Sequence, residues 1–215
     1  MTSYAHTKAT LEIMAKAPII PVMTVQSVED GLAQARALVA GGLVVLEITL
    51  RTAAAMDAIK AIAKDVKGAI VGVGTITKAS EIEAAAKAGA QFLVSPGTSP
   101  ALAAAAAASP IPFLPGIATA SEAMNLMDYG FSALKFFPAE AAGGAKYLSS
   151  IGGPLGSLRF CPTGGIDAEK AKTYLALKNV VCVGGSWMLP AAALAAKDYA
   201  TVERLAREAI MAVRG

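Results

Sequence analysis

Short apolar segments recur along the chain and alternate with Ala-rich stretches that carry polar residues on one face. The apolar segments cover residues 19–24, 43–48, 69–74, 92–95, 111–116, 132–137, 158–163 and 180–184. Each is followed by a helical stretch such as SVEDGLAQARALVAGG, and the unit repeats at intervals of about 20 to 26 residues. Strands that are almost continuously apolar and alternate with helices are typical of a parallel sheet covered by helices.

Eight such strands, each followed by a helix, predict a (β/α)8 barrel, the TIM barrel of the α/β class. A doubly wound open sheet is the main alternative, and the strand count and the even spacing favour the barrel. An extra N-terminal helix at about residues 7–17 precedes the first strand and is expected to cover the bottom of the barrel. No linker interrupts the pattern, so residues 1–215 are predicted to form a single domain.

Helix ends carry signals of their own. Ser27 and Ser80 are each followed three residues later by an acid, which predicts that their hydroxyl groups cap helix starts. Gly41, Gly42 and Gly89 fall just after helical runs, where a residue in the left-handed conformation commonly ends a helix.

Composition narrows the class of function. Hydrophobic residues make up 55% of the chain and charged residues 16%, which excludes a disordered or nucleic-acid-binding tail. The net charge of +3 comes from scattered basic residues, so no nucleic-acid partner is expected, although a small anionic substrate is compatible with it. His6 is the only histidine, which disfavours a histidine base and a histidine-built metal site. A carboxylate or a lysine must then carry any proton transfer near neutral pH.

Cysteine usage and the N-terminal segment point to the cytoplasm. Cys161 and Cys182 lie in apolar runs and are expected to be buried thiols in a reducing compartment. The first residues lack the pattern of a signal peptide. The most apolar stretch, residues 101–118, contains three prolines, so we expect no membrane association.

Three charged residues stand inside predicted strands. Arg159 lies near the start of its strand, where we expect a structural role low in the barrel, and the other two are Glu47 and Lys135. Of the 16 acids only Glu47 is placed within a strand, and of the lysines only Lys135 is well inside one. Both are near the C-terminal ends of their strands, where the active site of a (β/α)8 barrel lies. Alternation along each strand predicts that Leu43 and Val45 share the inward face with Glu47, and that Ala133 and Phe137 share it with Lys135.

The lysine has a chemical interpretation and a structural one. Only a neutral amine attacks a carbonyl group, and burial among Leu134, Phe136 and Phe137 disfavours the charged ammonium form. Lys135 is therefore suited to forming a Schiff base with a ketone or keto acid, with Glu47 as the proton acceptor for C–C cleavage. The structural alternative is an internal ion pair between the two side chains.

Glycine motifs end the last two predicted strands. PTGGI contributes Thr163, Gly164 and Gly165, and GGSW contributes Gly184, Gly185 and Ser186. Phosphate sites of barrels form from the loops after strands seven and eight, where glycines let backbone N–H groups approach phosphate oxygens. The two motifs in these positions predict a phosphate site.

Two further residues have open interpretations. Arg51, in EITLRT, is either a solvated arginine at a helix start or a bidentate clamp on a carboxylate. Thr75, in GVGT, belongs to a plain turn or donates to a substrate oxygen.

The chain resembles the class I 2-keto-3-deoxy-6-phosphogluconate (KDPG) and 4-hydroxy-2-oxoglutarate (KHG) aldolases. The resemblance rests on EITLRT, GVGT, SPGT, LKFFPAE, RFCPTGGI and GGSW, in that order over nearly the whole chain. It implies that Lys135 is the Schiff-base lysine and that Glu47 is the general acid and base, working partly through a water. It also implies that Arg51 and Thr75 hold the carboxylate end of the substrate.

The resemblance extends to further residues and to the assembly. Pro96 and Phe137 would line the site, and the two glycine motifs would bind the phosphate. The family uses no metal or other cofactor and is usually a homotrimer.

The implied reaction is the reversible cleavage of KDPG to pyruvate and glyceraldehyde 3-phosphate, with KHG cleavage to pyruvate and glyoxylate as a second activity. Three alternatives stay open on the sequence. They are the C4-epimeric 2-keto-3-deoxy-6-phosphogalactonate aldolase, a phosphosugar isomerase or epimerase on the same barrel, and a non-enzymatic phosphometabolite-binding protein.

Overall fold

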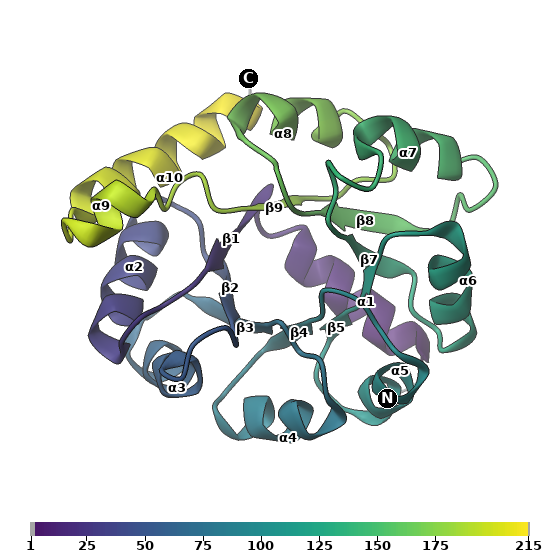
Figure 1. Cartoon of the computed structure of the whole chain (residues 1–215), viewed down its shortest axis with the longest axis horizontal. Helices are drawn as coiled ribbons and strands as arrows, with labels where there is room; N and C mark the ends of the chain where they lie inside the picture. Colours follow the sequence, from purple (N-terminus) through teal and green to yellow (C-terminus); the bar gives the residue numbers. More distant parts are fainter. Residues whose placement is uncertain (1–2, 215) are drawn as a thin grey trace.

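The computed structural model describes residues 3–214 and shows short parallel strands in the middle, surrounded by helices (Figure 1). The strands are β1 (Ile19–Met23), β2 (Val45–Thr49), β3 (Ile70–Gly74), β4 (Phe92–Val94), β5 (Phe113–Leu114), β6 (Gly116–Ile117), β7 (Ala133–Phe136), β8 (Arg159–Pro162) and β9 (Val183–Gly185). Every strand pair is parallel, which makes this an α/β fold with parallel sheets.

Helices connect the strands and cover their outer side. They are α1 (Ser3–Met14), α2 (Val28–Ala40), α3 (Ala55–Asp65), α4 (Ala79–Lys87), α5 (Pro100–Ala108), α6 (Ala120–Asp128), α7 (Gly144–Ile151), α8 (Ala168–Leu175), α9 (Ala191–Ala195) and α10 (Tyr199–Arg214). No helix within residues 3–214 has both the length and the apolar composition that crossing a membrane requires.

Strands that follow one another in sequence are neighbours in space. One sheet has the order β5-β4-β3-β2-β1-β9 and the other has the order β6-β7-β8. Pro115 alone separates β5 from β6, so the predicted strand at 111–116 is present as two short pieces. On the other side, isolated parallel bridges join Phe160 to Val180 and Thr163 to Gly184.

Two apolar clusters lie on opposite faces of the strands. The inner cluster gathers residues from six strands and from the segments next to them: Met14, Ala17, Ile20, Val45, Phe92, Val94, Leu114, Ala133, Cys161 and Cys182. The outer cluster lies between strands and helices and includes Leu46, Ile48, Leu134 and Phe136. The predicted alternation is confirmed for Val45 and Ala133. It is wrong for Leu43, which precedes β2 and packs in the outer cluster.

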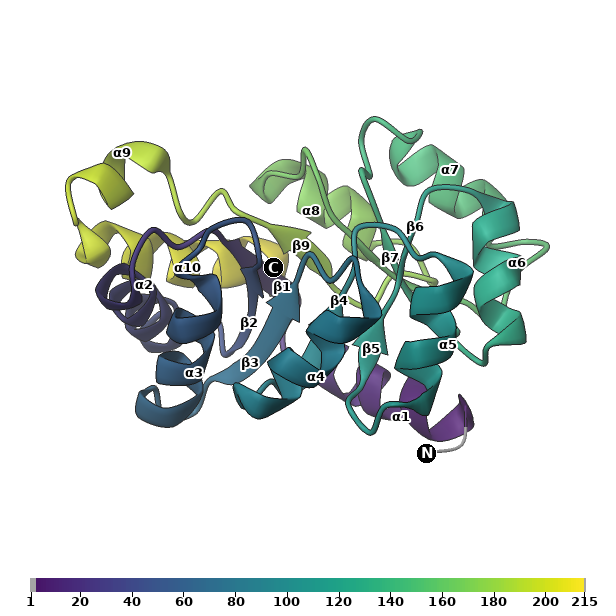
Figure 2. The ribbon, with the colours of Figure 1, turned by 60° about the horizontal axis from the view of Figure 1, so that its bottom comes forward.

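Helix α1 lies against one end of the strands (Figure 2). The Thr7 hydroxyl donates to the Gly130 carbonyl at 3.0 Å, and the Thr10 hydroxyl donates to the Phe113 carbonyl at 3.2 Å. Met14 places its side chain in the inner cluster. The helix spans Ser3–Met14, a few residues before the predicted range of 7–17.

One predicted helix cap is confirmed and one is wrong. The Ser27 hydroxyl accepts a hydrogen bond from the Asp30 N–H at 3.1 Å and caps α2. Ser80, in contrast, lies inside α4, which begins earlier because the Glu81 carboxylate accepts from the Thr77 and Lys78 N–H groups at 2.7 and 3.0 Å. The sequence around Ser80 is therefore compatible with two helix starts, and Glu81 selects the earlier one.

Of the three glycines predicted to end helices in the left-handed conformation, two do so. Gly42 and Gly89 have φ values of 96° and 90°, which are left-handed. Gly41 has a φ of −75° and lies against α10, where a Cβ atom would meet the Ala206 side chain and the Glu203 carbonyl. Gly41 is therefore required by close helix packing and not by its backbone conformation.

The inner cluster leaves no room for a side chain at Gly72. A Cβ atom there would enter the ring of Phe92, which is 2% exposed. We predict that Gly72→Ala lowers the free energy of unfolding by about 1–3 kcal/mol through overpacking. Urea denaturation followed by circular dichroism measures this. Gly97→Ala is the matched control, because a Cβ atom at that position would have no atom within 4 Å, and equal losses in the two variants would contradict the prediction.

Candidate active site

Lys135 and Glu47, which are 88 residues apart in sequence, meet between the two sheets. The Lys135 Nζ lies 2.9 Å from Glu47 Oε1 and 3.2 Å from Oε2, so the ammonium donates to both carboxylate oxygens. Each side chain is 4% exposed. The ion pair that the structural interpretation anticipates is therefore present, and it joins β7 of one sheet to β2 of the other.

The surroundings of Lys135 differ from the sequence prediction. Leu134 and Phe136 face the helices in the outer cluster, so they do not exclude water from the amine. The aromatic group near the amine is Phe137, whose ring centroid is 5.5 Å from Nζ. Burial of Lys135 comes instead from its position between its neighbours in the ladder, Gly116 on β6 and Cys161 on β8.

Gly74 makes room for the Glu47 carboxylate. A Cβ atom on Gly74 would fall on Glu47 Oε1 and would also lie 2.6 Å from its Cγ atom. The sequence prediction treats GVGT as a turn or a source of the Thr75 hydroxyl and misses this role. The signal for it is present in the sequence, because a glycine ending the strand next to a buried acid leaves space for that acid.

Hydrogen bonds from the SPGT segment fix the backbone on the other side of Lys135. The Ser95 hydroxyl accepts from the Gly116 N–H at 3.0 Å, and the Thr98 hydroxyl donates to the Gly116 carbonyl at 3.1 Å. Ser95 and Thr98 also bond each other at 2.9 Å. Pro96, which is half-buried, lies between them, and its carbonyl abuts Gly116. The sequence pattern assigns no role to Ser95 or Thr98.

The two glycine motifs lie together and line a cavity of about 130 Å³. Its walls are formed by Val22, Arg51, Phe137, Thr163, Gly164, Gly165, Ile166, Gly185 and Ser186. Gly184 pairs with Thr163 and lies directly behind the Thr163 side chain, where any Cβ would collide with the hydroxyl group. Val22 and Ile166 are additions that the sequence pattern does not reveal.

Arg51 is the charged residue of this cavity wall. Its side chain is exposed, and it forms no hydrogen bond or ion pair with the side chains described for residues 7–213. Helix α3 begins only at Ala55, so Arg51 belongs to the preceding turn. A free guanidinium beside glycine-rich backbone is suited to binding an anion.

Strained backbone occurs at the same rim. Thr75 follows β3 with a φ of 65°, a left-handed value that costs a residue with a side chain about 1–3 kcal/mol. Gly164 and Gly165 also have positive φ values, 104° and 74°. Glycine adopts such φ values without strain, so of these three residues only Thr75 carries this cost.

The other chemistry-bearing residues lie elsewhere or are inert. Cys161 and Cys182 are buried free thiols. The hydrogen bond from Cys161, followed by burial, raises the pKa of Cys182, which keeps this thiol neutral. Among the side chains that the structure describes, those of residues 7–213, no three His, Cys, Asp or Glu groups lie together as metal ligands. Arg159, predicted to be structural, donates to the Gly156 and Leu158 carbonyls at the start of β8.

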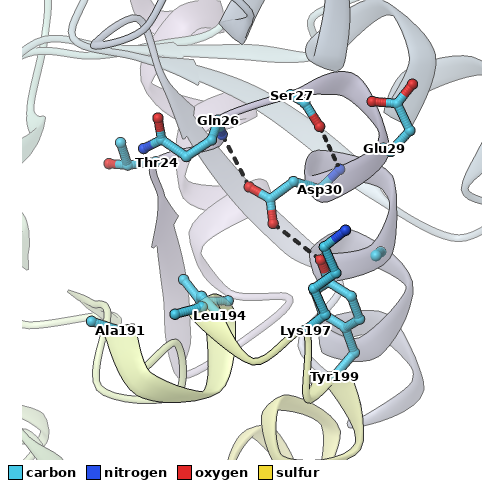
Figure 3. A pocket seen from close by; sticks show the side chains of 11 residues that line it. Thr24, Gln26, Ser27, Glu29, Asp30, Ala191, Leu194, Lys197 and Tyr199 are labelled. Atoms are coloured by element: carbon cyan, nitrogen blue, oxygen red, sulfur yellow. Dashed lines mark hydrogen bonds between the residues drawn. The ribbon is translucent and has the colours of Figure 1, made fainter.

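A larger cavity of about 740 Å³ lies between the start of α2 and the segment from α9 to α10 (Figure 3). The Asp30 carboxylate within it accepts from the Gln26 N–H at 3.0 Å, from Gln34 at 2.9 Å and from the Tyr199 hydroxyl at 3.2 Å. Neither Lys135 nor Glu47 lines either cavity, but Phe137, whose ring centroid is 5.5 Å from Lys135 Nζ, lines the smaller one and not this one. Its most buried acid is occupied in tying α2 to α10, so the smaller cavity beside the ion pair is the candidate site.

The geometry suits carbonyl chemistry on an anionic substrate. Proton transfer from Nζ to Glu47 within the pair produces a neutral amine and a neutral carboxylic acid. The amine can then attack a carbonyl carbon, and the acid can return its proton to the oxygen that leaves. The adjoining cavity offers a guanidinium, hydroxyl groups and backbone N–H groups to an anionic end.

Comparison with known proteins extends over nearly the whole chain. The family model described as KDPG and KHG aldolase matches residues 11–205. The chain is 52% identical over 198 residues to the KHG/KDPG aldolase of Escherichia coli strain K12, an alignment that covers 92% of this chain and 93% of that protein.

Two solved structures share the arrangement of the backbone. The KDPG aldolase of Legionella pneumophila, with pyruvate captured at low pH as a covalent carbinolamine intermediate, has a TM-score of 0.91 and 39% identity over 94% of this chain and 98% of that chain. The 2-keto-3-deoxy-6-phosphogluconate aldolase of Zymomonas mobilis ZM4, with 3-phosphoglycerate, has a TM-score of 0.91 and 43% identity over 95% and 96% of the two chains.

The buried pair predicts a non-additive effect on stability. Lys135→Met leaves the Glu47 carboxylate buried without its partner, and we expect the free energy of unfolding at pH 7 to fall by about 3–5 kcal/mol. Lys135→Met combined with Glu47→Leu removes both charges and should recover most of this loss. Urea denaturation of both single variants and the double variant gives the coupling energy. Strictly additive losses would contradict the pairing.

Proposed function

Because this chain belongs to the KDPG and KHG aldolase family, we propose that it cleaves KDPG reversibly to pyruvate and glyceraldehyde 3-phosphate through a Schiff base on Lys135. It is a class I aldolase, a carbon–carbon lyase, and KHG cleavage to pyruvate and glyoxylate is its second activity. The observation that carries the assignment of Lys135 is its amine, 2.9 Å from Glu47 and buried beside an arginine- and glycine-lined cavity.

The first half of the reaction builds the Schiff base. Glu47 takes a proton from Nζ, and the neutral amine attacks the C2 ketone. A second proton then passes from the nitrogen to the C2 oxygen, which gives the neutral carbinolamine. Glu47 then returns the proton to the C2 oxygen, water leaves, and an iminium forms between Nζ and C2. The carboxylate that remains is close to the reacting carbons, because it was the hydrogen-bond partner of Nζ.

Cleavage and release use the same two groups. Glu47 removes the proton from the C4 hydroxyl, the C3–C4 electron pair moves into the iminium, and glyceraldehyde 3-phosphate departs. Glu47 gives that proton to C3 of the remaining enamine, and water hydrolyses the resulting iminium to release pyruvate and free Lys135. No external oxidant, reductant or cofactor enters this sequence.

The remaining predicted residues orient the substrate. Arg51 and Thr75 hold the carboxylate end, and Pro96 and Phe137 line the reacting centre. The phosphate is bound by the two glycine motifs, which are Thr163, Gly164, Gly165, Gly184, Gly185 and Ser186. Four features support this arrangement: the free guanidinium, the left-handed Thr75, the 5.5 Å contact between Phe137 and Nζ, and the shared cavity.

We further propose a closed (β/α)8 barrel in a single domain over residues 1–215, with β5 and β6 acting as one strand bent at Pro115. Closure of the barrel is supported by the isolated parallel bridges from Phe160 to Val180 and from Thr163 to Gly184, which join β8 and its following residue to β9 and the segment before it. The homotrimer rests on family membership alone. A cytoplasmic location is supported by the two free buried thiols.

Reductive trapping tests the Schiff base directly. With pyruvate and borohydride, the chain should gain the mass of pyruvate less one oxygen atom, on the peptide that contains Lys135. Lys135→Met should gain nothing, and its kcat on KDPG should fall more than about 10³-fold. Lys172→Met, which removes an exposed lysine, is the control and should trap like wild type. Absence of trapping in wild type would favour an isomerase or epimerase that uses the same pair without a covalent adduct.

Comparing two substrates tests the position of Arg51. If Arg51 holds the keto acid carboxylate, Arg51→Met should lower kcat/KM by a similar factor, about 10–100-fold, for phosphorylated KDPG and unphosphorylated KHG. Arg51→Lys keeps the charge without the bidentate fork and should fall between wild type and Arg51→Met. Coupled assays of pyruvate release measure both substrates and both C4 epimers. A loss confined to KDPG would move Arg51 to the phosphate end.

A further inference from the structure

Glu140 closes the LKFFPAE segment and links it to the glycine loop of residues 163–165. Its Oε1 accepts a hydrogen bond from the Tyr174 hydroxyl at 2.6 Å, and its Oε2 lies 3.0 Å from Lys170 Nζ. Lys170 also donates to the Gly165 carbonyl at 2.9 Å. Tyr174 is 1% exposed, so its hydroxyl group needs the partner that Glu140 supplies.

All three carbonyl groups of the glycine loop accept hydrogen bonds from neighbouring residues. The Ala139 N–H donates to the Thr163 carbonyl at 2.8 Å, and the Glu140 N–H donates to the Gly164 carbonyl at 3.2 Å. With the bond from Lys170 to Gly165, three successive carbonyls are held by the segment from Ala139 to Glu140 and by α8.

Held carbonyls fix the direction of the N–H groups. The C=O and N–H of one planar trans peptide point in opposite directions. Because the Gly164 and Gly165 carbonyls point toward Glu140 and Lys170, the N–H groups of Gly165 and Ile166 point away from them. Both residues line the small cavity, and neither N–H donates a hydrogen bond within the described part of the chain. They are therefore available to an anion.

The Glu140 side chain also packs directly on the loop. A Cβ atom on Gly165 would lie 2.8 Å from Glu140 Cγ, so the stem of the acid rests against the Gly165 backbone. The hydrogen bond from Tyr174, followed by that from Lys170, lowers the pKa of Glu140 and keeps it ionised at neutral pH. Burial, together with Glu140, raises the pKa of Tyr174, which keeps the phenol protonated as a donor.

We propose that Glu140, braced by Tyr174 and Lys170, is a positioning residue that orients the backbone N–H groups of the glycine loop toward the substrate phosphate. It sets the preference of the enzyme for phosphorylated over unphosphorylated keto acids without touching the reacting atoms. This inference rests on the proposed function of the glycine loop as the phosphate site.

Substrate comparison separates this role from a structural one. Glu140→Gln keeps an acceptor for Tyr174 but loses the charge that holds Lys170, and we expect KM for KDPG to rise roughly tenfold. The kcat on KDPG, kcat/KM on KHG and pyruvate trapping on Lys135 should stay within about twofold of wild type, because the amine and Glu47 are untouched. Tyr174→Phe should shift KM in the same direction by a smaller factor.

The matched control is Glu169→Gln, an acid on α8, the helix that carries Lys170 and Tyr174; Glu169 pairs with Lys172 and not with the loop. It should behave like wild type. Equal losses on KDPG and KHG in Glu140→Gln would show a general structural role and overturn the proposal, as would no change on either substrate.

Binding of inorganic phosphate, measured by titration calorimetry, needs no turnover and keeps the two proposals distinguishable. Weaker phosphate binding by Glu140→Gln than by wild type supports the positioning role, even if wild type fails to trap pyruvate and the aldolase proposal is lost. Unchanged phosphate binding in Glu140→Gln overturns it, even if trapping succeeds.

Discussion

The rest of the structure depends on keeping one ammonium–carboxylate pair out of water. Removing Lys135 and Glu47 from solvent costs several kcal/mol for each ion, and their attraction repays this only with close geometry. Contacts of 2.9 and 3.2 Å provide that geometry. Such a pair contributes little net stability. In the proposed reaction its value is chemical, because a proton can move along the hydrogen bond and leave a neutral amine beside its own acid.

Closely packed strands and backbone hydrogen bonds surround the Lys135–Glu47 pair. Gly74 and Gly116 bring β3 and β6 close on either side, and the hydroxyl groups of Ser95 and Thr98 hold Gly116 in place. Beyond Phe137, the carbonyls of the glycine loop accept hydrogen bonds from Ala139, Glu140 and Lys170, and the N–H groups of Gly165 and Ile166 point away from them. In the proposed function, covalent chemistry takes place at the Lys135–Glu47 pair and anion binding at the glycine loop. The two sites are adjacent, and different residues hold each in place.

Much of this could be predicted because the signals are local. The strand positions follow from continuous apolar runs, and the cap at Ser27 follows from the acid three residues later. Glu47 and Lys135 are conspicuous because charged residues inside strands are rare. Local signals gave the wrong start for α4, because both Ser80 and Glu81 fit a helix start. They also gave the wrong face for Leu43, because β2 begins later than its apolar run. They also misjudged which neighbours bury the amine, because Leu134 and Phe136 face the opposite side of β7 from Lys135.

The sequence by itself determined the order of strands and helices, the two reactive side chains and the glycine motifs, because each depends on residue type and short-range spacing. Tertiary structure decided that Lys135 and Glu47 are bonded to each other, that Gly74 gives the acid its space, and that Glu140 reaches Tyr174 and Lys170. These contacts join residues between 27 and 88 positions apart. The packing of strands and helices that are distant in sequence brings them together, and no local pattern encodes these contacts.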